Sequence, residues 1–514
     1  MIEDGNMDKD ISVMREATRR FYSGEMSVKE YKSVSGGFGR YAQKGAEKSM
    51  VRLRLAGGSI DKDKLAFICD CIRKYDIDMV HLTTCQAMQF HDLDGDAACD
   101  IIEGAFDHGI ITLGGGGDNP RNVTASPLSG VEPGEMFDVL PYARAVERYV
   151  MSIYGTFRMP RKLKIGFSNS PENETHATFR DLGFVAKWNG TFDVYSAGGL
   201  GNNPRMGVCV YRDAPPGKVL YFVDAMIRNF ILHGNYENRT KARTRYMQET
   251  LGTDGYVTAF NGELSASLAR GGLDISVGSD TTVKRGNGTV EMPRVHRQEQ
   301  DGLYYVAYHP IGGDPAPSKV LEIEETIRDM DGVEIRLSPD ETMYIINCDA
   351  DEAARVAAVT DDGARTLFES SVSCVGNTIC QIGLRDSRGL LEDLIGMSRR
   401  NGFADGVLPR VRISGCVSSC GNHQIGVIGF QGMSKKVDGV SRPAFNVFLN
   451  GSHIRGEERF GDPIGSMTAE DIPCFLEDIG RAVSAEGTDY RAWSSENRDR
   501  ILSIAERYTS IGPE

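Results

Sequence analysis

Four cysteines in the C-terminal half are spaced in a way that could hold an iron–sulfur cluster. They form C-x5-C and then, after a gap of 35 residues, C-x3-C, and they are Cys374, Cys380, Cys416 and Cys420. A [4Fe–4S] cube takes one thiolate per iron, which four cysteines supply. Thiolates also bind zinc, but zinc sites usually have shorter loops within each pair than the first one here. The spacing therefore favours an iron–sulfur cluster, with four unrelated buried thiols as the alternative.

The chain that must position these cysteines contains an internal sequence repeat. Residues 79–93 read M-V-H-L-T-T-C-Q-A-M-Q-F-H-D-L and residues 332–348 read G-V-E-I-R-L-S-P-D-E-T-M-Y-I-I-N-C, which sets Thr83 opposite Ser338. Both segments lie between two stretches of helical pattern, and both follow a strand that ends in paired glycines. Each copy thus has the order strand–helix–strand–helix, about half of a ferredoxin-like domain. The repeat predicts a duplicated protein, and chance similarity of two such units is the alternative.

A larger stretch of strands and helices follows each copy. The predicted fold class is α/β with ferredoxin-like (α+β) half-domains, and the duplicated parts are expected to be related by pseudo-twofold symmetry. Within the first larger stretch we expect a strand at 162–167 and a helix at 239–251. The predicted domains are an N-terminal extension (1–40), half-domain 1 (41–109), α/β domain 1 (110–298), half-domain 2 (299–364) and α/β domain 2 with the four cysteines (365–514).

The bulk composition excludes several classes of protein. The net charge of −14, from 58 Lys+Arg against 72 Asp+Glu, disfavours a nucleic-acid partner, which takes a basic footprint. No apolar run is long enough to span a bilayer, and the acidic N-terminus M-I-E-D-G has the features of neither a secretory signal nor a transit peptide. Eleven cysteines in 514 residues do not indicate a disulfide scaffold. We therefore expect a cytoplasmic protein that has no membrane partner.

Taken together, the motifs resemble those of the siroheme-dependent sulfite and nitrite reductases. The match rests on the four-cysteine pattern with its flanking glycines, and it covers nearly everything from Gly36 to the C-terminus. Five further runs carry it: T-T-x-Q-x-x-Q-F-H at 83–91, N-P-R-N-V-T at 119–124, P-R-K-L-K at 160–164, G-G-L-G-N-N-P at 198–204 and G-N-Y-E-N-R-T-K-A-R at 234–243. The resemblance implies one siroheme and one [4Fe–4S] cluster that share a thiolate, which by position is that of Cys420.

The resemblance also implies an oxyanion substrate held by cations in a pocket where solvent does not dilute their charge. By motif these are Arg121, Lys162 and Lys164. Alternate residues of a strand share a face, so the two lysines are expected to point together, and a solvated strand face is the alternative. The K-x-K form resembles the sulfite reductases, whereas the nitrite reductases of the family tend to have K-x-N.

One position departs from the family pattern, because Cys85 stands where the family usually has arginine, as T-T-R-Q. A permanently charged, bidentate anion contact is thus replaced by a small thiol. Three interpretations are open. Arg52 or Arg54 supplies the missing cation, or the substrate is larger or less charged, or Cys85 itself takes part through a persulfide or a covalent adduct. A thiolate near Arg121 and two lysines would have a lowered pKa and be reactive.

Further polar residues of the matched motifs are implied to contact the cofactor. They are Thr83, Thr84, Gln86, Gln89, His91, Asn122 and Asn422. The glycine run 114–117 lacks the G-K-S/T of a phosphate loop, so we expect it to give a close backbone approach to the macrocycle.

The sequence thus predicts a ferredoxin-dependent sulfite reductase of single-chain, assimilatory type, which reduces sulfite to sulfide with six electrons. Ferredoxin, or a similar low-potential donor, is expected because no dinucleotide-binding fingerprint is visible. Reduction of nitrite to ammonia by the same cofactors is the first alternative. The second is a diverged siroheme and iron–sulfur protein with a sulfur-transfer or electron-carrying role.

Overall fold

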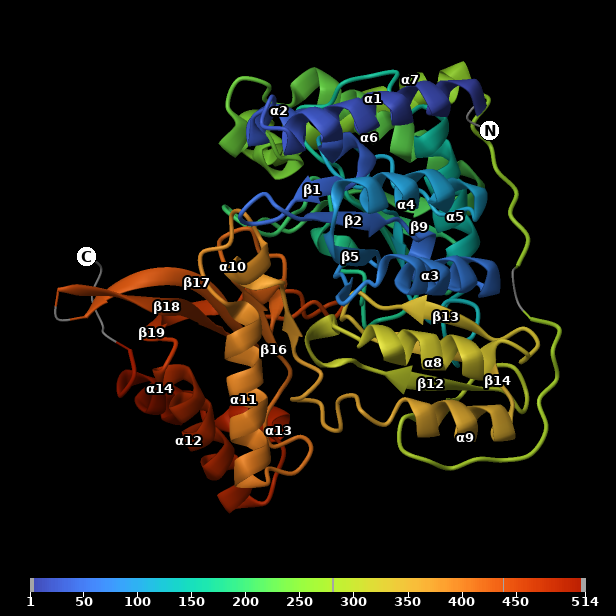
Figure 1. The fold of residues 1–514 in the computed structure, drawn as a ribbon. Helices are drawn as coiled ribbons and strands as arrows, with labels where there is room; N and C mark the ends of the chain where they lie inside the picture. Colours follow the sequence, from blue (N-terminus) through green and yellow to red (C-terminus); the bar gives the residue numbers. More distant parts are fainter. Residues whose placement is uncertain (1–3, 280–281, 438, 510–514) are drawn as a thin grey trace. The chain divides into compact units, whose positions relative to one another are not determined.

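The computed structural model describes residues 4–279, 282–437 and 439–509 and divides the chain into two units (Figure 1). The first unit runs to Gly199 and continues through Pro204–Tyr308 and Asp314–Asp361; the second holds Leu200–Asn203, His309–Gly313 and the chain from Asp362 on. Within the described ranges, no helix has both the length and the apolar character needed to cross a membrane.

Two antiparallel sheets in the first unit form the duplicated ferredoxin-like halves. The first has the order β1-β2-β5-β4, with β1 (Arg40–Ala42), β2 (Ser49–Leu53), β4 (Val80–Leu82) and β5 (Met88–Leu93), and its helices are α3 (Lys62–Tyr75) and α4 (Gly95–Asp107). The second has the order β11-β12-β14-β13-β3, with β11 (Val295–Arg297), β12 (Tyr304–Tyr308), β14 (Met343–Cys348), β13 (Glu334–Leu337) and β3 (Ser59–Ile60), and its helices are α8 (Pro317–Ile327) and α9 (Ala350–Val359). The predicted repeat is confirmed, and the two halves share one hydrophobic core.

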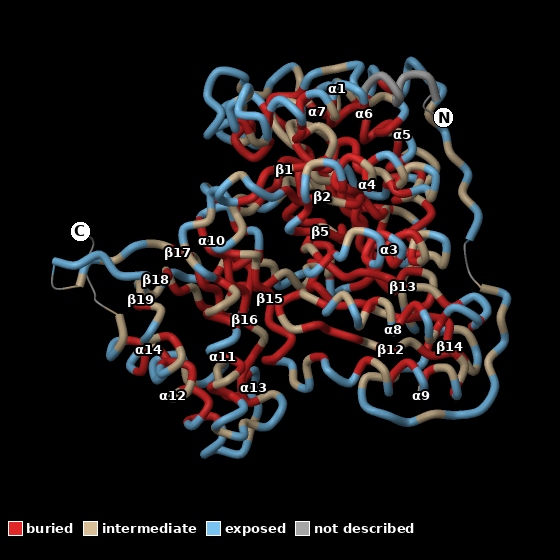
Figure 2. Tube along the Cα trace, viewed as in Figure 1, coloured by how far each residue is buried: buried red, intermediate tan, exposed pale blue. Residues whose placement is uncertain are grey.

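The same turn joins the repeated strands in both halves. The Thr83 amide donates to the Ala87 carbonyl at 2.9 Å, and the Ser338 amide donates to the Thr342 carbonyl at 2.7 Å. One strand crosses between the halves, since β3 follows β2 in the chain but pairs with β13, Ile60 lying opposite Ile335. Figure 2 shows that buried residues lie along the strands of these sheets.

The two larger sheets have one topology, in which two parallel pairings are followed by two antiparallel ones. In the first unit the order is β10-β9-β8-β7-β6, with β6 (Thr124–Ala125), β7 (Ile165–Ser168), β8 (Leu182–Ala186), β9 (Phe192–Ser196) and β10 (Val208–Ala214) and with helices α5 (Leu140–Ser152), α6 (Val219–His233) and α7 (Met247–Arg270). In the second unit the order is β15-β16-β17-β18-β19, with β15 (Val372–Ser373), β16 (Val411–Ser414), β17 (Ile428–Val437), β18 (Val440–Leu449) and β19 (Asp462–Thr468). Its helices are α10 (Gly376–Ile379), α11 (Ser387–Asn401), α12 (Asp471–Glu486), α13 (Tyr490–Glu496) and α14 (Arg498–Glu506). The predicted fold class is confirmed.

Two local predictions next to the site need correction. The strand expected at 162–167 begins at Ile165, so both lysines precede it. The helix expected at 239–251 is confirmed only from Met247, where α7 begins, because short 3-10 turns occupy Arg239–Lys241 and Thr244–Tyr246. The reason is that Arg243 and Thr244 both donate to the Asp181 carboxylate, Arg243 Nη2 at 2.9 Å from Oδ2, which draws this segment away from a helical path.

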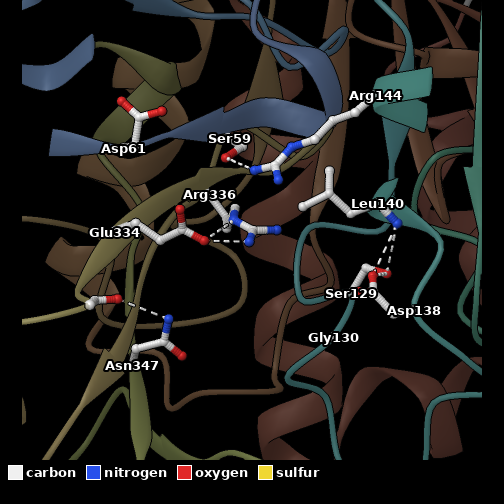
Figure 3. A network of polar contacts seen from close by, with 12 residues as sticks. Ser59, Asp61, Ser129, Gly130, Asp138, Leu140, Arg144, Glu334, Arg336 and Asn347 are labelled. Atoms are coloured by element: carbon white, nitrogen blue, oxygen red, sulfur yellow. Dashed lines mark hydrogen bonds and ion pairs between the residues drawn. The ribbon is translucent and has the colours of Figure 1, made fainter. Parts of the chain in front are cut away.

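Other elements of the first unit brace the two halves. The N-terminal helices α1 (Asp4–Tyr22) and α2 (Val28–Ser35) precede β1, and Arg15 of α1 donates to Asp100 of α4 at 2.9 Å. Figure 3 shows a polar network beside β13, in which Arg336 pairs with Glu334 and Arg144 of α5 donates to Ser59 of β3 at 2.9 Å. Arg336 donates to Glu334, although its buried Nη1 has no hydrogen-bond partner among the described residues, and we assign the network to packing.

Candidate active site and cluster-binding loops

The turn between β4 and β5 presents Cys85. The Thr83 hydroxyl accepts from the amides of Cys85, at 3.3 Å, and Ala87, at 3.1 Å. From the opposite side, Asn122 Nδ2 donates to the carbonyls of Cys85, at 2.9 Å, and Gln86, at 3.0 Å. These bonds fix the backbone on both sides of the thiol, which is itself half-buried.

The Gln86 side chain connects the same turn to neighbouring backbone by hydrogen bonds. Its backbone is left-handed, with φ at 53°, and its side chain is fully buried. Nε2 donates to the carbonyls of Ala125, at 2.8 Å, and Leu337, at 2.7 Å, while Oε1 accepts from the Ala125 amide at 2.9 Å. Because the backbone already engages both ends of this amide, Gln86 acts as a positioning residue. Contact with a cofactor stays a prediction for this residue.

The three predicted cations lie together beside this turn. Lys162 and Lys164 flank Leu163 just before β7, and Leu163 pairs with Pro120 in a parallel bridge. The Arg121 amide donates to the Leu163 carbonyl at 2.8 Å, which ties the N-P-R-N segment to the K-x-K segment. Both lysines lie in an extended segment just before the strand and both act on Cys85, while their role as anion ligands stays a prediction.

Charge around Cys85 favours its thiolate. Burial acts to raise the pKa of this thiol, but Lys164, Arg180 and Lys162 act to lower it, and Lys164 also hydrogen-bonds the sulfur. The net result lowers the pKa of Cys85 to about 6. Burial lowers the pKa of the Lys164 ammonium, the thiolate opposing this in part. Cys85 is thus a thiolate at neutral pH with an ammonium against it.

Alkylation should detect this thiolate directly. We expect iodoacetamide to modify Cys85 with a half-maximal rate near pH 6, because the thiolate is the nucleophile and an ordinary thiol ionises near 9.0. Peptide mass spectrometry of Cys85 across pH 5 to 9, in steps of about half a unit, measures it. The buried thiol of Cys69, whose pKa burial raises to about 12, serves as the internal control and should stay unmodified. A midpoint near 9 for Cys85 would contradict the geometry.

The Arg121 guanidinium is held by the glycine run 114–117. Nη1 donates to the Gly115 carbonyl at 2.7 Å and Nη2 to the Gly117 carbonyl at 2.9 Å. Burial lowers the pKa of Arg121 to about 10, although Tyr41 opposes that shift. A Cβ on Gly116 would lie 2.3 Å from the Gly36 carbonyl oxygen, so the close approach that these glycines permit is to Gly36. An approach of this run to a macrocycle stays a prediction.

Neither Arg52 nor Arg54 is available to replace an arginine at position 85. Arg54 forms a buried ion pair with Glu147, Nη2 to Oε1 at 2.7 Å, and donates to the Leu113 carbonyl at 2.8 Å. Arg52 donates to the Gly115 carbonyl at 2.6 Å. Gln89 lies beside it and accepts from its Nε and Nη2, at 2.9 and 2.6 Å, once the amide is turned to satisfy both groups.

The remaining predicted cofactor contacts are buried polar side chains on both units. Thr84, Gln89 and His91 are buried along the β4–β5 segment of the first unit. Asn422 lies in the second unit with φ at 57°, and its buried Nδ2 has no hydrogen-bond partner among the described residues. A buried donor without a partner is expected at a position where a polar group of a ligand would accept its hydrogen bond. A role for these residues in holding siroheme stays a prediction.

The four cysteines of the second unit lie on two loops that leave adjacent parallel strands. Cys374 follows β15 and Cys416 follows β16, and carboxyl ends of parallel strands meet at one edge of a sheet. The Cys374 amide donates to the Ile413 carbonyl at 3.2 Å, and the Gly415 amide donates to the Cys374 sulfur at 3.2 Å. An N–H aimed at sulfur stabilises a thiolate ligand and tunes a cluster.

The other two cysteines return to the same edge. Cys380 ends the short helix α10, and the chain after it folds back so that the Arg385 amide donates to the Gly415 carbonyl at 3.0 Å. Cys420 is exposed, and the next amide, that of Gly421, donates to Ser414 Oγ at 3.1 Å. In the described ranges no three His, Cys, Asp or Glu side chains are gathered as a metal-ligand group. The backbone and the thiol chemistry fit a cube, and ligation by these four residues stays a prediction.

Sequence reasoning missed Arg180 and Asp181. Arg180 is among the charges that act on Cys85, and Asp181 Oδ2 accepts from the Lys164 amide at 2.8 Å. The sequence offers one signal, an Arg-Asp dipeptide just ahead of the apolar strand L-G-F-V-A, and the structure shows that both residues are buried. The relevance of these two residues to the site becomes visible only in the structure, where strand β7 pairs with β8 and places them beside the lysines.

Comparison with known proteins identifies the family. The chain matches "Nitrite and sulphite reductase 4Fe-4S domain" over residues 116–267 and "Nitrite/Sulfite reductase ferredoxin-like half domain" over residues 41–105. A ferredoxin–nitrite reductase of Synechococcus elongatus is 24% identical over 84% of this chain and 85% of its own length. The chloroplastic ferredoxin–nitrite reductase of Spinacia oleracea is 26% identical over 83% and 72%, respectively.

A solved structure agrees with the fold. That of the Mycobacterium tuberculosis NirA protein has a TM-score of 0.80 and 21% identity, and the match covers 96% of this chain and 95% of that one. With the duplicated half-domains, the two sheets of one topology and the matched segments in place, the chain belongs to the siroheme-dependent sulfite and nitrite reductase family, an oxidoreductase family whose cofactors are siroheme and a [4Fe–4S] cluster.

Proposed function

We propose that this protein reduces nitrite to ammonia with electrons from ferredoxin. The observation that carries the proposal is the group of half-buried cations around Cys85, which suits a small oxyanion. The names of the relatives support nitrite as that anion and ferredoxin as the donor. The sequence prediction placed sulfite first and nitrite second, and the relatives favour the reverse order.

The residues of the first unit have distinct tasks in this reaction. Nitrite takes up six electrons and eight protons to give ammonium and two waters. The siroheme and cluster, when bound, supply the electrons. Arg121, Lys162 and Lys164 bind and orient the anion, since cations that are partly shielded from water act more strongly on it than exposed ones. Lys164 also holds a proton at Nζ, and because burial lowers its pKa it gives that proton up more readily than an exposed lysine would.

Sulfite is the second candidate, and the paired lysines favour it. Sulfite carries up to two negative charges and nitrite one, so a site with Lys164 in addition to Lys162 gains more from sulfite. Cys85 opposes this gain, because its thiolate offsets part of the positive charge. The balance between these two effects decides the substrate.

Turnover under anaerobic conditions separates the candidates. With reduced methyl viologen as donor and the cofactor-loaded protein, we expect kcat/KM for nitrite to exceed that for sulfite by at least about tenfold, a difference of about 1.4 kcal/mol in transition-state binding. Ammonia and sulfide are measured as products, and reduced ferredoxin then replaces the viologen. A preference for sulfite would establish the second candidate. Negligible rates with both anions would favour the sulfur-transfer or electron-carrying alternative.

A further inference from the structure

Arg180 has a buried guanidinium whose hydrogen-bond donors are only partly satisfied by the protein. The residue lies just before β8 and is 6% exposed. Its Nε donates to the Thr175 carbonyl at 2.7 Å, and its stem crosses Gly166 of β7, where a Cβ would lie 3.4 Å from Arg180 Cγ. Nη2 is buried and makes no hydrogen bond among the described residues. A buried guanidinium N–H without an acceptor is costly, so an anion is expected to complete it.

The pairing of β7 and β8 brings Arg180 beside Lys164. Ile165 lies opposite Leu182 in the parallel ladder, so the residues before each strand are neighbours. The adjacent carboxylate, Asp181, is already engaged by Arg243 Nη2, at 3.1 and 2.9 Å from its two oxygens. Arg180 lowers the pKa of Lys164, as a second cation close by must.

Both cations act on the sulfur of Cys85. Of the charges that lower the pKa of this thiol, Lys164 has the largest effect and Arg180 the next, followed by Lys162. Arg121 is also within electrostatic reach of this sulfur, because the Cys85 thiolate acts to raise the pKa of Arg121. Cys85 thus lies among four cations: the two lysines of the segment just before β7, Arg180 just before β8, and Arg121 of the N-P-R-N segment.

We infer that Arg180 is a substrate-binding residue, which supplies from the segment just before β8 the guanidinium that position 85 lacks, and that the Cys85 sulfur occupies the anion position until substrate binds. The inference rests on the proposed reduction of a small oxyanion. A guanidinium binds an oxyanion through parallel N–H donors, which an ammonium cannot do. When the anion enters, the thiolate loses its cationic partners and takes one proton from solvent, so the total charge of the pocket is preserved.

A purely structural role for Arg180 makes a different prediction. If Arg180 serves only to hold Thr175, then Arg180→Lys, which lacks the Nε donor, should do as much harm as Arg180→Gln, which keeps an amide N–H. If the positive charge matters, Arg180→Lys should retain function and Arg180→Gln should lose it. Arg212→Gln is the matched control, because Arg212 lies on β10 of the same sheet and is exposed, with Asp193 at 3.4 Å.

The experiment uses the oxidised, cofactor-loaded protein without turnover. Nitrite is titrated and binding is followed by the siroheme absorbance, and iodoacetamide labelling of Cys85 is measured against pH by peptide mass spectrometry. We expect Arg180→Gln to weaken nitrite binding at least about tenfold and to raise the labelling midpoint by about one pH unit. Arg180→Lys should keep most of both properties, and Arg212→Gln should match the unaltered protein. Bound nitrite should slow the labelling of Cys85.

The other possible results of this experiment decide separately about the inference and about the proposed function. Unchanged nitrite binding in Arg180→Gln overturns the inference, whether or not the labelling midpoint moves, and so does equal damage in Arg180→Lys and Arg180→Gln. The proposed function fails separately, if the unaltered protein turns over neither nitrite nor sulfite. If in that case nitrite still protects Cys85 in a manner that requires Arg180, the anion site stands and only the reaction is wrong.

Discussion

Replacing Cys416 with alanine should remove the cluster and lower turnover by more than about a hundredfold. Loss of a group that only orients a metal ligand costs about 10–100-fold, so loss of a proposed ligand should cost more. Cys416 is buried, lies two residues after the end of β16, and directly follows Gly415, whose amide donates to the Cys374 sulfur. Iron and acid-labile sulfide content, with the electron paramagnetic resonance spectrum of the reduced protein, measures the loss.

Cys474→Ala is the control for this prediction. Cys474 lies in the same unit on α12, and its thiol is free and exposed. This variant should keep the iron content and turnover of the unaltered protein. A full complement of iron and sulfide in the purified Cys416→Ala protein would show that the cluster uses other ligands.

Replacing Arg54 with methionine should destabilise the first unit by about 3–5 kcal/mol, because it leaves the Glu147 carboxylate buried and unpaired. The two side chains are 1% and 6% exposed and lie 2.7 Å apart. Arg54 also donates to the carbonyls of Leu113, at 2.8 Å, and of Pro120 and Arg121, both at 3.1 Å, so its loss leaves three further acceptors without this donor. Thermal unfolding of the cofactor-loaded protein, followed by circular dichroism, gives the change in Tm.

The control is an ion pair with an exposed arginine. Arg212→Met breaks a contact with Asp193 at 3.4 Å, but Arg212 is 69% exposed and the buried Asp193 keeps Lys187 at 3.4 Å, so the loss should be about 0–1 kcal/mol. Its Tm should be nearly unchanged. The double variant Arg54→Met with Glu147→Gln should recover part of the loss, since it removes the unpaired charge. A single Arg54→Met variant as stable as Arg212→Met would show that water reaches this pair.

The duplication could be predicted because each copy carries its own local signals. Paired glycines stand ahead of each repeat, and in the structure Gly57 and Gly312 both have positive φ, at 59° and 64°. The four-cysteine pattern could be recognised for the same reason, because its signal is spacing along the chain, and ligation of a cluster by it stays a prediction. Arg180 could not, since its neighbours Lys164 and Cys85 are set by strand pairing and not by sequence distance.

The errors have the same physical origin. Arg52 and Arg54 looked available because the sequence does not reveal which carbonyl groups will be buried beside them. The helix expected at 239–251 has the right composition, but the Asp181 carboxylate, far away in the chain, binds Arg243 and Thr244. Contacts over long sequence distances decided each of these outcomes.

The exchange of β3 between the halves has a consequence for synthesis on the ribosome. Ile60 pairs with Ile335, and 335 − 60 leaves 275 residues to be made after β3 emerges. At about 5–20 residues per second this takes roughly 14–55 s. During that interval β3 has no partner strand, and the early half of the core lacks the apolar side chains of the late half. Final assembly of the first unit must therefore wait until translation has passed β13, which makes this interval the period of greatest exposure to chaperones and aggregation.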